Sequence, residues 1–182
     1  MHSSTLKDLS APSLAALGIR GQDAPHMLAT LLQLSRRPAT LLLRDLAGVN
    51  LRITVVRTGQ RGLNVSEAHP LDAPEGTPCR WRTGRLETAD GGLAAGVSLL
   101  WLPGRLDAGT CAGLDAAAEP AGVILGRLGM RRVQRRAVAV HVIDEITGED
   151  AAVMSRAVLA VGGQAVAIAE ENFTTAFTES LA

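Results

Sequence analysis

Aromatic side chains are almost absent from this sequence: two Phe, two Trp and no Tyr make up 2% of its 182 residues. Proteins that bind single-stranded nucleic acid commonly stack bases on aromatic rings, so the composition does not favour that class. The core must be packed mainly by Ala, Val and Leu, because apolar residues still account for 47% of the sequence. With 20% charged residues, this composition is ordinary for a globular protein.

The sequence also lacks a net charge, with 18 basic and 18 acidic residues. This balance argues against strong attraction to nucleic acid or to a membrane surface. No apolar run approaches the roughly 20 residues of a membrane span, and the polar start does not resemble a secretory signal. Cys79 and Cys111 are the only cysteines, and they match no metal-ligand spacing. We therefore expect a cytoplasmic protein with reduced thiols, no metal, no nucleic-acid partner and no membrane span.

The length predicts a single domain over residues 1–182, in which residues 1–25 pack loosely because they are rich in Ser, Ala, Pro and Gly. Apolar residues at helical spacing predict a first helix that begins near Asp23 and is stopped by Pro38. Further helices are expected over residues 41–46, 107–118 and 120–129, with one helical turn near 149–154.

Alternating apolar and polar residues predict the strands. They are expected over residues 51–57, 79–88, 93–102, 136–143, 157–161 and 165–173. Glycine-containing turns at residues 89–92 and 162–164 predict two hairpins, and the polar stretch 58–78 is expected to be a long loop. The predicted fold class is α+β, with a single antiparallel sheet of about five or six strands and helices packed on one side.

Arginines on the first hairpin strand are candidates for ligand binding. On a regular strand Arg80 and Arg82 share one face, while Trp81 and Arg85 share the other. An arginine that points into a pocket can hold a carboxylate through two parallel hydrogen bonds. The alternative is that these arginines are exposed to solvent, and spacing alone favours it. Spacing also favours solvent exposure for the five arginines between residues 127 and 136.

Glu170 is the second candidate. It falls on the strand face of Val166 and Ile168, which the apolar pattern indicates is buried, whereas Glu171 would point the other way. A buried carboxyl is costly and is therefore a candidate functional group. The alternative is that the strand has ended and both glutamates are solvated.

Five landmarks, in order, resemble the chorismate–pyruvate lyase family. They are Trp81-Arg82, Ala89-Asp90-Gly91, Leu102-Pro103, Ile124-Leu125-Gly126-Arg127 and Val166-Ala167-Ile168-Ala169-Glu170. The resemblance extends from about residue 27 to the C-terminus. It implies a sheet that encloses a small-ligand cavity and a lyase that eliminates pyruvate from chorismate to give 4-hydroxybenzoate, a step of ubiquinone biosynthesis. That reaction needs no cofactor and no metal.

The resemblance also implies roles for particular residues. Arg82 would anchor the ring carboxylate and Glu170 would receive or position the product hydroxyl, so both would be catalytic. The backbone amide at Leu125, beside Gly126, would contact the ligand carboxylate. Arg85 is the alternative to Arg82 as the substrate-binding arginine, and Arg82 is preferred because it follows Trp81.

The same fold is shared by the effector-sensing domains of GntR-type transcription regulators. This sequence has Val97 or Ser98 where the lyases carry a second arginine. The alternative function is therefore a non-catalytic domain that binds a small aromatic acid, without the DNA-binding domain of such regulators. Either function implies a small aromatic or enolpyruvyl carboxylate as partner, and the sequence leaves the oligomeric state open.

Overall fold

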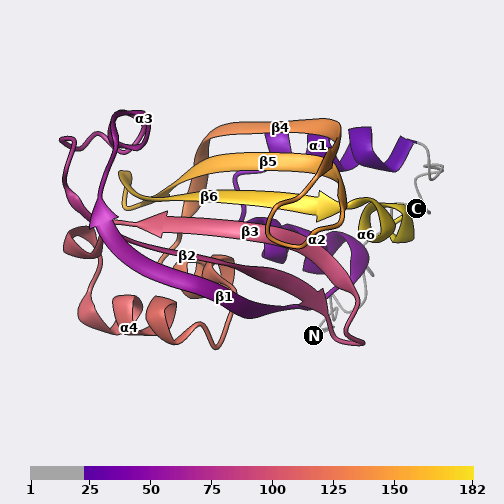
Figure 1. Ribbon diagram of the computed structural model, residues 1–182, viewed down its shortest axis with the longest axis horizontal. Coiled ribbons are helices and arrows are strands. Elements are labelled where there is room, and N and C mark those ends of the chain that lie inside the picture. The colour runs from indigo at the N-terminus through magenta and orange to yellow at the C-terminus, as the bar shows by residue number, and fades with distance from the viewer. Residues whose placement is uncertain (1–22) are drawn as a thin grey trace, which may run out of the picture.

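The computed structural model describes residues 23–182, and the expectation for residues 1–25 falls almost entirely outside this range. Within it the fold is α+β, with one six-stranded antiparallel sheet in the order β1-β2-β3-β6-β5-β4 (Figure 1). The fold class predicted from the sequence is thereby confirmed. The strands are β1 (Leu51–Gly62), β2 (Pro78–Thr88), β3 (Leu93–Trp101), β4 (Arg131–Ile143), β5 (Asp150–Val161) and β6 (Gln164–Thr174).

The β3–β6 pair joins the two halves of the sheet. β3 forms a hairpin with β2 through the predicted turn, and β6 forms one with β5. Because β3 and β6 are neighbours, residues distant in sequence meet in one row across the sheet, as Arg82 pairs with Leu99 and Leu99 pairs with Ala169. This pairing brings β2 near the last strand.

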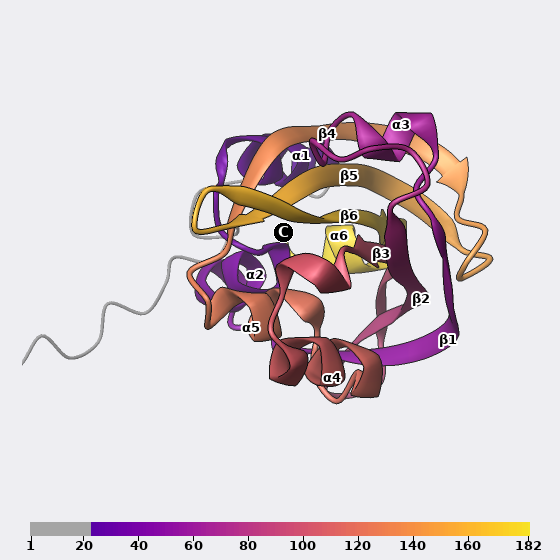
Figure 2. The same cartoon turned by 90° about the vertical axis from the view of Figure 1, so that its left-hand side faces the viewer.

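Most of the helices cover one face of the sheet. The helices are α1 (Ala24–Leu34), α2 (Ala39–Ala47), α3 (Val65–Ala68), α4 (Ala108–Ala116), α5 (Ala121–Gly126) and α6 (Thr175–Ser180), with a short 3-10 helix at Pro103–Arg105. The sheet curves around α2 and α5, so this face is concave (Figure 2). The short α3 and its flanking loops instead cover the convex face at one end, where Leu63, Ala68 and Leu71 are buried.

Several elements differ from the sequence-based prediction. The expected loop 58–78 contains the second half of β1, whose polar residues are exposed along the sheet edge, and α3, which Asn64 and Glu67 cap reciprocally. β5 begins at Asp150, where a helical turn was expected, because pairing with strands on both sides overrides local propensity. α5 ends at Gly126 rather than near Gly129, and α6 was not predicted.

The concave face carries two separate apolar clusters. One is formed by α1, α2 and α6 with residues such as Leu86 and Phe173. The other is formed by α4 and α5 with residues such as Leu99 and Leu159. Polar residues of four different strands lie between the two clusters, and the candidate site is found there.

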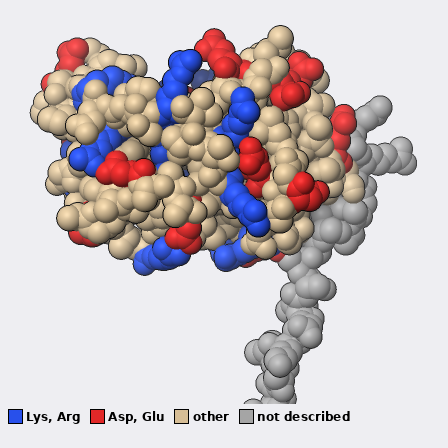
Figure 3. Space-filling view, turned by 60° about the horizontal axis from the view of Figure 1, so that its bottom comes forward, with Lys and Arg blue, Asp and Glu red and all other residues tan. Residues whose placement is uncertain are grey.

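Charged side chains of both signs are dispersed over the face seen in Figure 3. Figure 3 shows acidic and basic groups interspersed on one face, without an extended region of one sign, as the balanced composition predicts. Among the described residues no helix is both long enough and apolar enough to cross a membrane.

Candidate functional site

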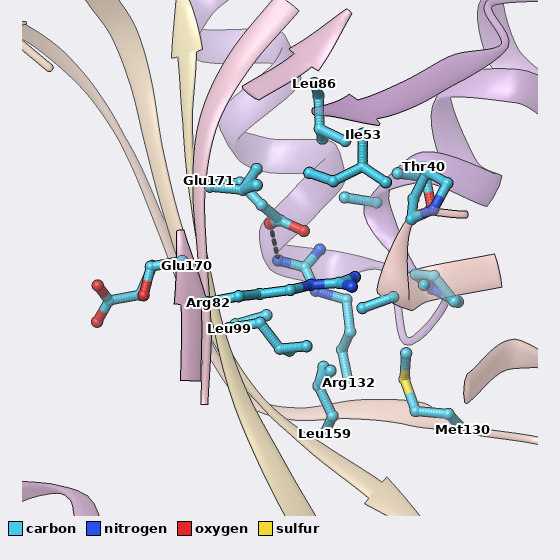
Figure 4. A pocket seen from close by; sticks show the side chains of 18 residues that line it. Thr40, Ile53, Arg82, Leu86, Leu99, Met130, Arg132, Leu159, Glu170 and Glu171 are labelled. Atoms are coloured by element: carbon cyan, nitrogen blue, oxygen red, sulfur yellow. Dashed lines mark hydrogen bonds and ion pairs between the residues drawn. The ribbon is translucent and has the colours of Figure 1, made fainter. Parts of the chain in front are cut away.

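A cavity lies on the concave face between the two apolar clusters (Figure 4). The space open to the centre of a water molecule is about 50 Å³, and the empty space between the lining atoms, mouth included, is about 540 Å³. The smaller volume holds a few water molecules, so a larger ligand requires side chains to move apart. Its walls are mostly apolar and include Ile53, Leu86, Val97, Leu99, Met130 and Leu159.

Arg82 projects from β2 into this cavity (Figure 4), although the spacing of the three arginines by itself favoured solvated side chains. The residue is only 4% exposed. Its guanidinium donates a hydrogen bond to the carbonyl of Leu114 in α4, and it forms no ion pair with a carboxylate of the described residues. Burial lowers the pKa of Arg82, and the charge of Asp115 offsets this effect only in part. Asp115 itself is paired with Arg80. The cavity therefore contains a cation without a counter-charge.

Arg132 of β4 is a second buried cation, but it has an acidic partner. The residue is 1% exposed, and its guanidinium lies 3.3 Å from Oε2 of Glu171 in β6. It also donates to the hydroxyl of Ser155, which in turn donates to Glu171 at 3.0 Å. A further hydrogen bond reaches the carbonyl of Leu32 at the end of α1. Four charged residues line the cavity, but the carboxylate of Glu170 points away from it and pairs with Arg156 (Figure 4). Since Glu171 offsets Arg132, the charge that remains inside is the single positive charge of Arg82.

The N-terminus of α2 adds hydrogen-bond donors to the same cavity. Within α2 the first N–H to be paired is that of Leu42, which donates to Pro38, so the N–H groups of residues 39–41 lack helical partners. Thr40 lines the cavity, is 9% exposed, and its buried hydroxyl has no hydrogen-bond partner among the described residues. Unpaired N–H groups at a helix start favour an anion. Thr40 and Arg82 thus both present hydrogen-bond donors to this cavity.

Gly122 at the start of α5 keeps this corner open. A Cβ added there would lie 2.6 Å from Oγ1 of Thr40 and 2.8 Å from Cβ of Pro38. We expect Gly122→Ala to push the α2 and α5 ends apart or fill the corner, at a cost of about 1–3 kcal/mol in stability.

This expectation can be checked by chemical denaturation of the variant and the wild type. Gly113→Ala is the matched control, because a Cβ there meets only Ile124 at ordinary contact distances of 3.7 and 3.9 Å. Equal behaviour of the two variants would contradict the packing described here.

Glu170 belongs to the cavity wall, but its side chain does not point into the cavity as the sequence-based prediction expected. Its carboxylate points away from the cavity (Figure 4), lies 3.4 Å from Arg156 and is 46% exposed, while Glu171 is the glutamate turned inward. The face assignment is wrong for two reasons. First, β6 contains one extra residue relative to β5. Leu159 and Ala160 of β5 pair with Ala167 and Ala165 of β6, and Val166 between them has no partner on β5. Second, Ile168 is buried on the convex face, beneath the α3 segment.

The structure does not place the other predicted residues at the cavity. Arg85 is exposed, because it lies on the sheet face opposite to Arg82. Leu125 is fully buried in the cluster beneath α4 and α5. Gly126 packs near Leu41 and does not line the cavity, which α5 instead meets with Ala121 and Gly122 at its start.

Three residues of the site were missed by the sequence interpretation. Arg132 was assigned to a solvated run, and nothing in its spacing separates it from its arginine neighbours. Thr40 was expected only near the start of a helix. For Glu171 a signal was available: it follows Ala167 and Ala169 on one strand face, and small side chains leave room for a cavity. Among residues 23–182 no group of three or more His, Cys, Asp or Glu side chains is positioned to hold a metal ion.

The fold and the cavity define an α+β domain with an internal pocket between a curved sheet and helices. Solved structures of similar fold include PhnF from Mycobacterium smegmatis (TM-score 0.58, 12% identity, 78% of this chain and 65% of that chain). The effector domain of PhnF from the same organism has a TM-score of 0.56 at 14% identity over 75% of this chain and 85% of that chain. The ligand-binding domain of a regulator assigned to the GntR family, from Bordetella bronchiseptica, has a TM-score of 0.53 at 13% identity. The match covers 69% of this chain and 85% of that chain.

At these identities the likeness shows the fold alone, and it confirms the fold that the lyase resemblance implied. No protein-family model matches the sequence, and no curated protein matches it. The neighbours that carry the fold are effector and ligand-binding domains of regulators, as in the alternative function predicted from the sequence.

Proposed function

We propose that this chain is a small-molecule binding domain of the effector-sensing type, and that its cavity binds a small carboxylate with an apolar body. The observation that carries the proposal is Arg82, a cation that is 4% exposed and has no carboxylate partner among the described residues. An unpaired buried charge is costly. A ligand carboxylate would remove that cost on binding.

The surroundings of Arg82 support a ligand with one negative group. Arg132 and Glu171 offset each other, so one unit of positive charge is left for the ligand. The hydroxyl of Thr40 and the unpaired N–H groups of α2 would add neutral donors to the same group. A ligand with two carboxylates would leave one of them close to Glu171 or against apolar walls.

The remaining walls support an apolar ligand body. Leu86, Leu99, Met130 and Leu159 surround the cavity and offer no hydrogen-bonding side chains. An aromatic or branched aliphatic group would be buried there at about 25 cal/mol for each Å² of apolar surface removed from water. Benzoate and its 4-hydroxy derivative are the simplest probes with these properties.

The geometry supports binding rather than elimination of pyruvate. Glu170, the residue that the lyase resemblance implied as catalytic, points away from the cavity. Glu171 is held by Ser155 and Arg132, and the second arginine of the lyases is replaced by Val97 or Ser98. Chorismate carries two carboxylates, and the cavity has one unpaired cation.

Calorimetric titration with benzoate, 4-hydroxybenzoate and benzamide tests this proposal. We expect each acid to bind with 1:1 stoichiometry, and benzoate to bind at least about tenfold more tightly than benzamide, which has the same shape but no charge. Equal affinity of benzoate and benzamide would refute the role of Arg82.

Incubation with chorismate separates the two functions. We expect 4-hydroxybenzoate to accumulate no faster than in protein-free buffer, as measured by chromatography. Accumulation in proportion to protein concentration would restore the lyase function and overturn the proposal.

A further inference from the structure

A second groove lies on the convex face, directly behind the cavity. The space it leaves to the centre of a water molecule is about 300 Å³. Its floor is formed by Leu100 and Ile168, and its polar lining includes Arg61, Glu67, Thr83, Ser98, Arg156 and Glu170. Trp81 and Glu170, which belong to two of the sequence landmarks, therefore both line this groove.

Trp81 gives this groove an aromatic wall. It is partly exposed, whereas the other tryptophan, Trp101, is 1% exposed. The indole lies against Gly59 of the neighbouring strand, where any Cβ would be 2.7–2.8 Å from ring atoms. Because Gly59 has no side chain, the Trp81 ring can pack directly on β1, and this contact fixes the position of the ring in the groove.

Two ion pairs surround the aromatic wall. Arg61 and Glu67 form a bidentate pair with distances of 2.6 and 2.5 Å, and Arg156 lies 3.4 Å from Glu170. The two pairs are neighbours, because all four residues line the same groove. The pKa of Glu67 is lowered, chiefly by its hydrogen bond from Arg61 and to a smaller extent by the charge of Arg156. The four charges sum to zero, unlike those of the cavity.

Two hydroxyl groups complete the lining. Thr83 and Ser98 are register partners on β2 and β3, and Ser98 pairs in turn with Glu170 on β6. Both residues line the groove and are partly exposed. Together with Glu170 and Arg156, both about half exposed, they present donors and acceptors in one row.

We propose that this groove is a second ligand site, for an uncharged molecule with several hydroxyl groups, such as a monosaccharide. A charged ligand would have to compete with one of the existing ion pairs, because the two positive and two negative side chains of the groove already neutralise one another. A molecule with several hydroxyls can accept hydrogen bonds from Arg156 and donate to Glu170 at once. Its C–H groups can pack on the apolar body of Trp81, whose ring buries much area at little entropic cost.

The experiment is a titration of the protein with glucose, galactose, N-acetylglucosamine and myo-inositol in separate runs. Binding is monitored by the change in tryptophan fluorescence. The protein has no Tyr and two Trp, of which Trp81 alone lines the groove. We expect at least one of these compounds to change the emission in a saturable way, and the change to disappear in Trp81→Phe. Saturating benzoate should not displace the compound, because the two sites lie on opposite faces of the sheet.

Calorimetry on surface variants tests the polar lining. Glu170→Gln and Arg156→Gln are expected to weaken binding by about tenfold each, the effect of one charge-assisted hydrogen bond. Arg85→Gln, an exposed arginine outside the groove, is the matched control and should bind like the wild type. Absence of saturable binding for all four compounds, or unchanged binding in both groove variants, would overturn the second site without affecting the proposal for the cavity.

Discussion

Arg82→Ala is expected to abolish most of the affinity for benzoate. Removing one partner of a buried charge pair costs about 2–5 kcal/mol, which raises the Kd about 30-fold to several thousand-fold. The unliganded protein should lose little stability, because the variant loses the hydrogen bond to Leu114 but also loses a buried charge without a counter-charge. Calorimetric titration and a thermal melt of the same preparations measure both effects.

Arg80→Ala is the matched control for this variant. Arg80 lies on the same strand and the same face, but it is paired with Asp115, and its side chain is 33% exposed. It should change the Kd by less than about threefold, as expected for an exposed ion pair away from the ligand. A larger effect from Arg80 than from Arg82 would show that the ligand binds near α4 rather than in the cavity.

Glu171→Ala is expected to destabilise the fold by about 3–5 kcal/mol, because it leaves Arg132 buried without a counter-charge. That loss is a large part of the 5–15 kcal/mol typical of a folded domain. Ser155 would also lose its acceptor. Urea denaturation at neutral pH gives the difference in free energy of unfolding directly.

Glu170→Ala provides the comparison one residue away. Its pair with Arg156 is about half exposed on both sides, so we expect a change of no more than about 1 kcal/mol. The double variant Arg132→Met with Glu171→Ala should recover much of the stability, since neither buried charge then remains. Equal effects of the two single glutamate variants would contradict the burial difference between them.

The alternation of apolar residues was sufficient to predict the hairpin of β2 and β3 and the face shared by Arg80 and Arg82. Side chains on a strand alternate strictly unless a bulge intervenes, and the extra residue of the β2–β3 pair is Ala94 of β3, so the alternation along β2 is unbroken. For the same reason Arg85 could be assigned to the opposite face before the structure was known. The α+β class followed from the order of such local patterns.

The pairing of β3 with β6 and the packing of α3 were decided by the tertiary structure. An extra residue at Val166 and the burial of Ile168 beneath α3 exchange the expected orientations of Glu170 and Glu171. Neither effect is visible in a strand pattern, because α3 lies in a stretch whose polar composition is that of a loop. Because β6 is buried on both faces, its apolar residues do not mark a single buried face. The sequence pattern therefore could not show whether Glu170 or Glu171 points into the cavity.

The charge balance of the cavity was likewise decided by contacts between distant segments. Arg132 and Glu171 are 39 residues apart, and Arg132 and Leu32 are 100 residues apart. Composition determined that the chain would carry as many basic as acidic groups, and periodicity determined which strands and most helices would form. Which of the two buried arginines has an acidic partner and which is left for a ligand depends on the three-dimensional contacts. A buried charge loses its hydration, and an opposite charge within about 4–6 Å compensates for that loss.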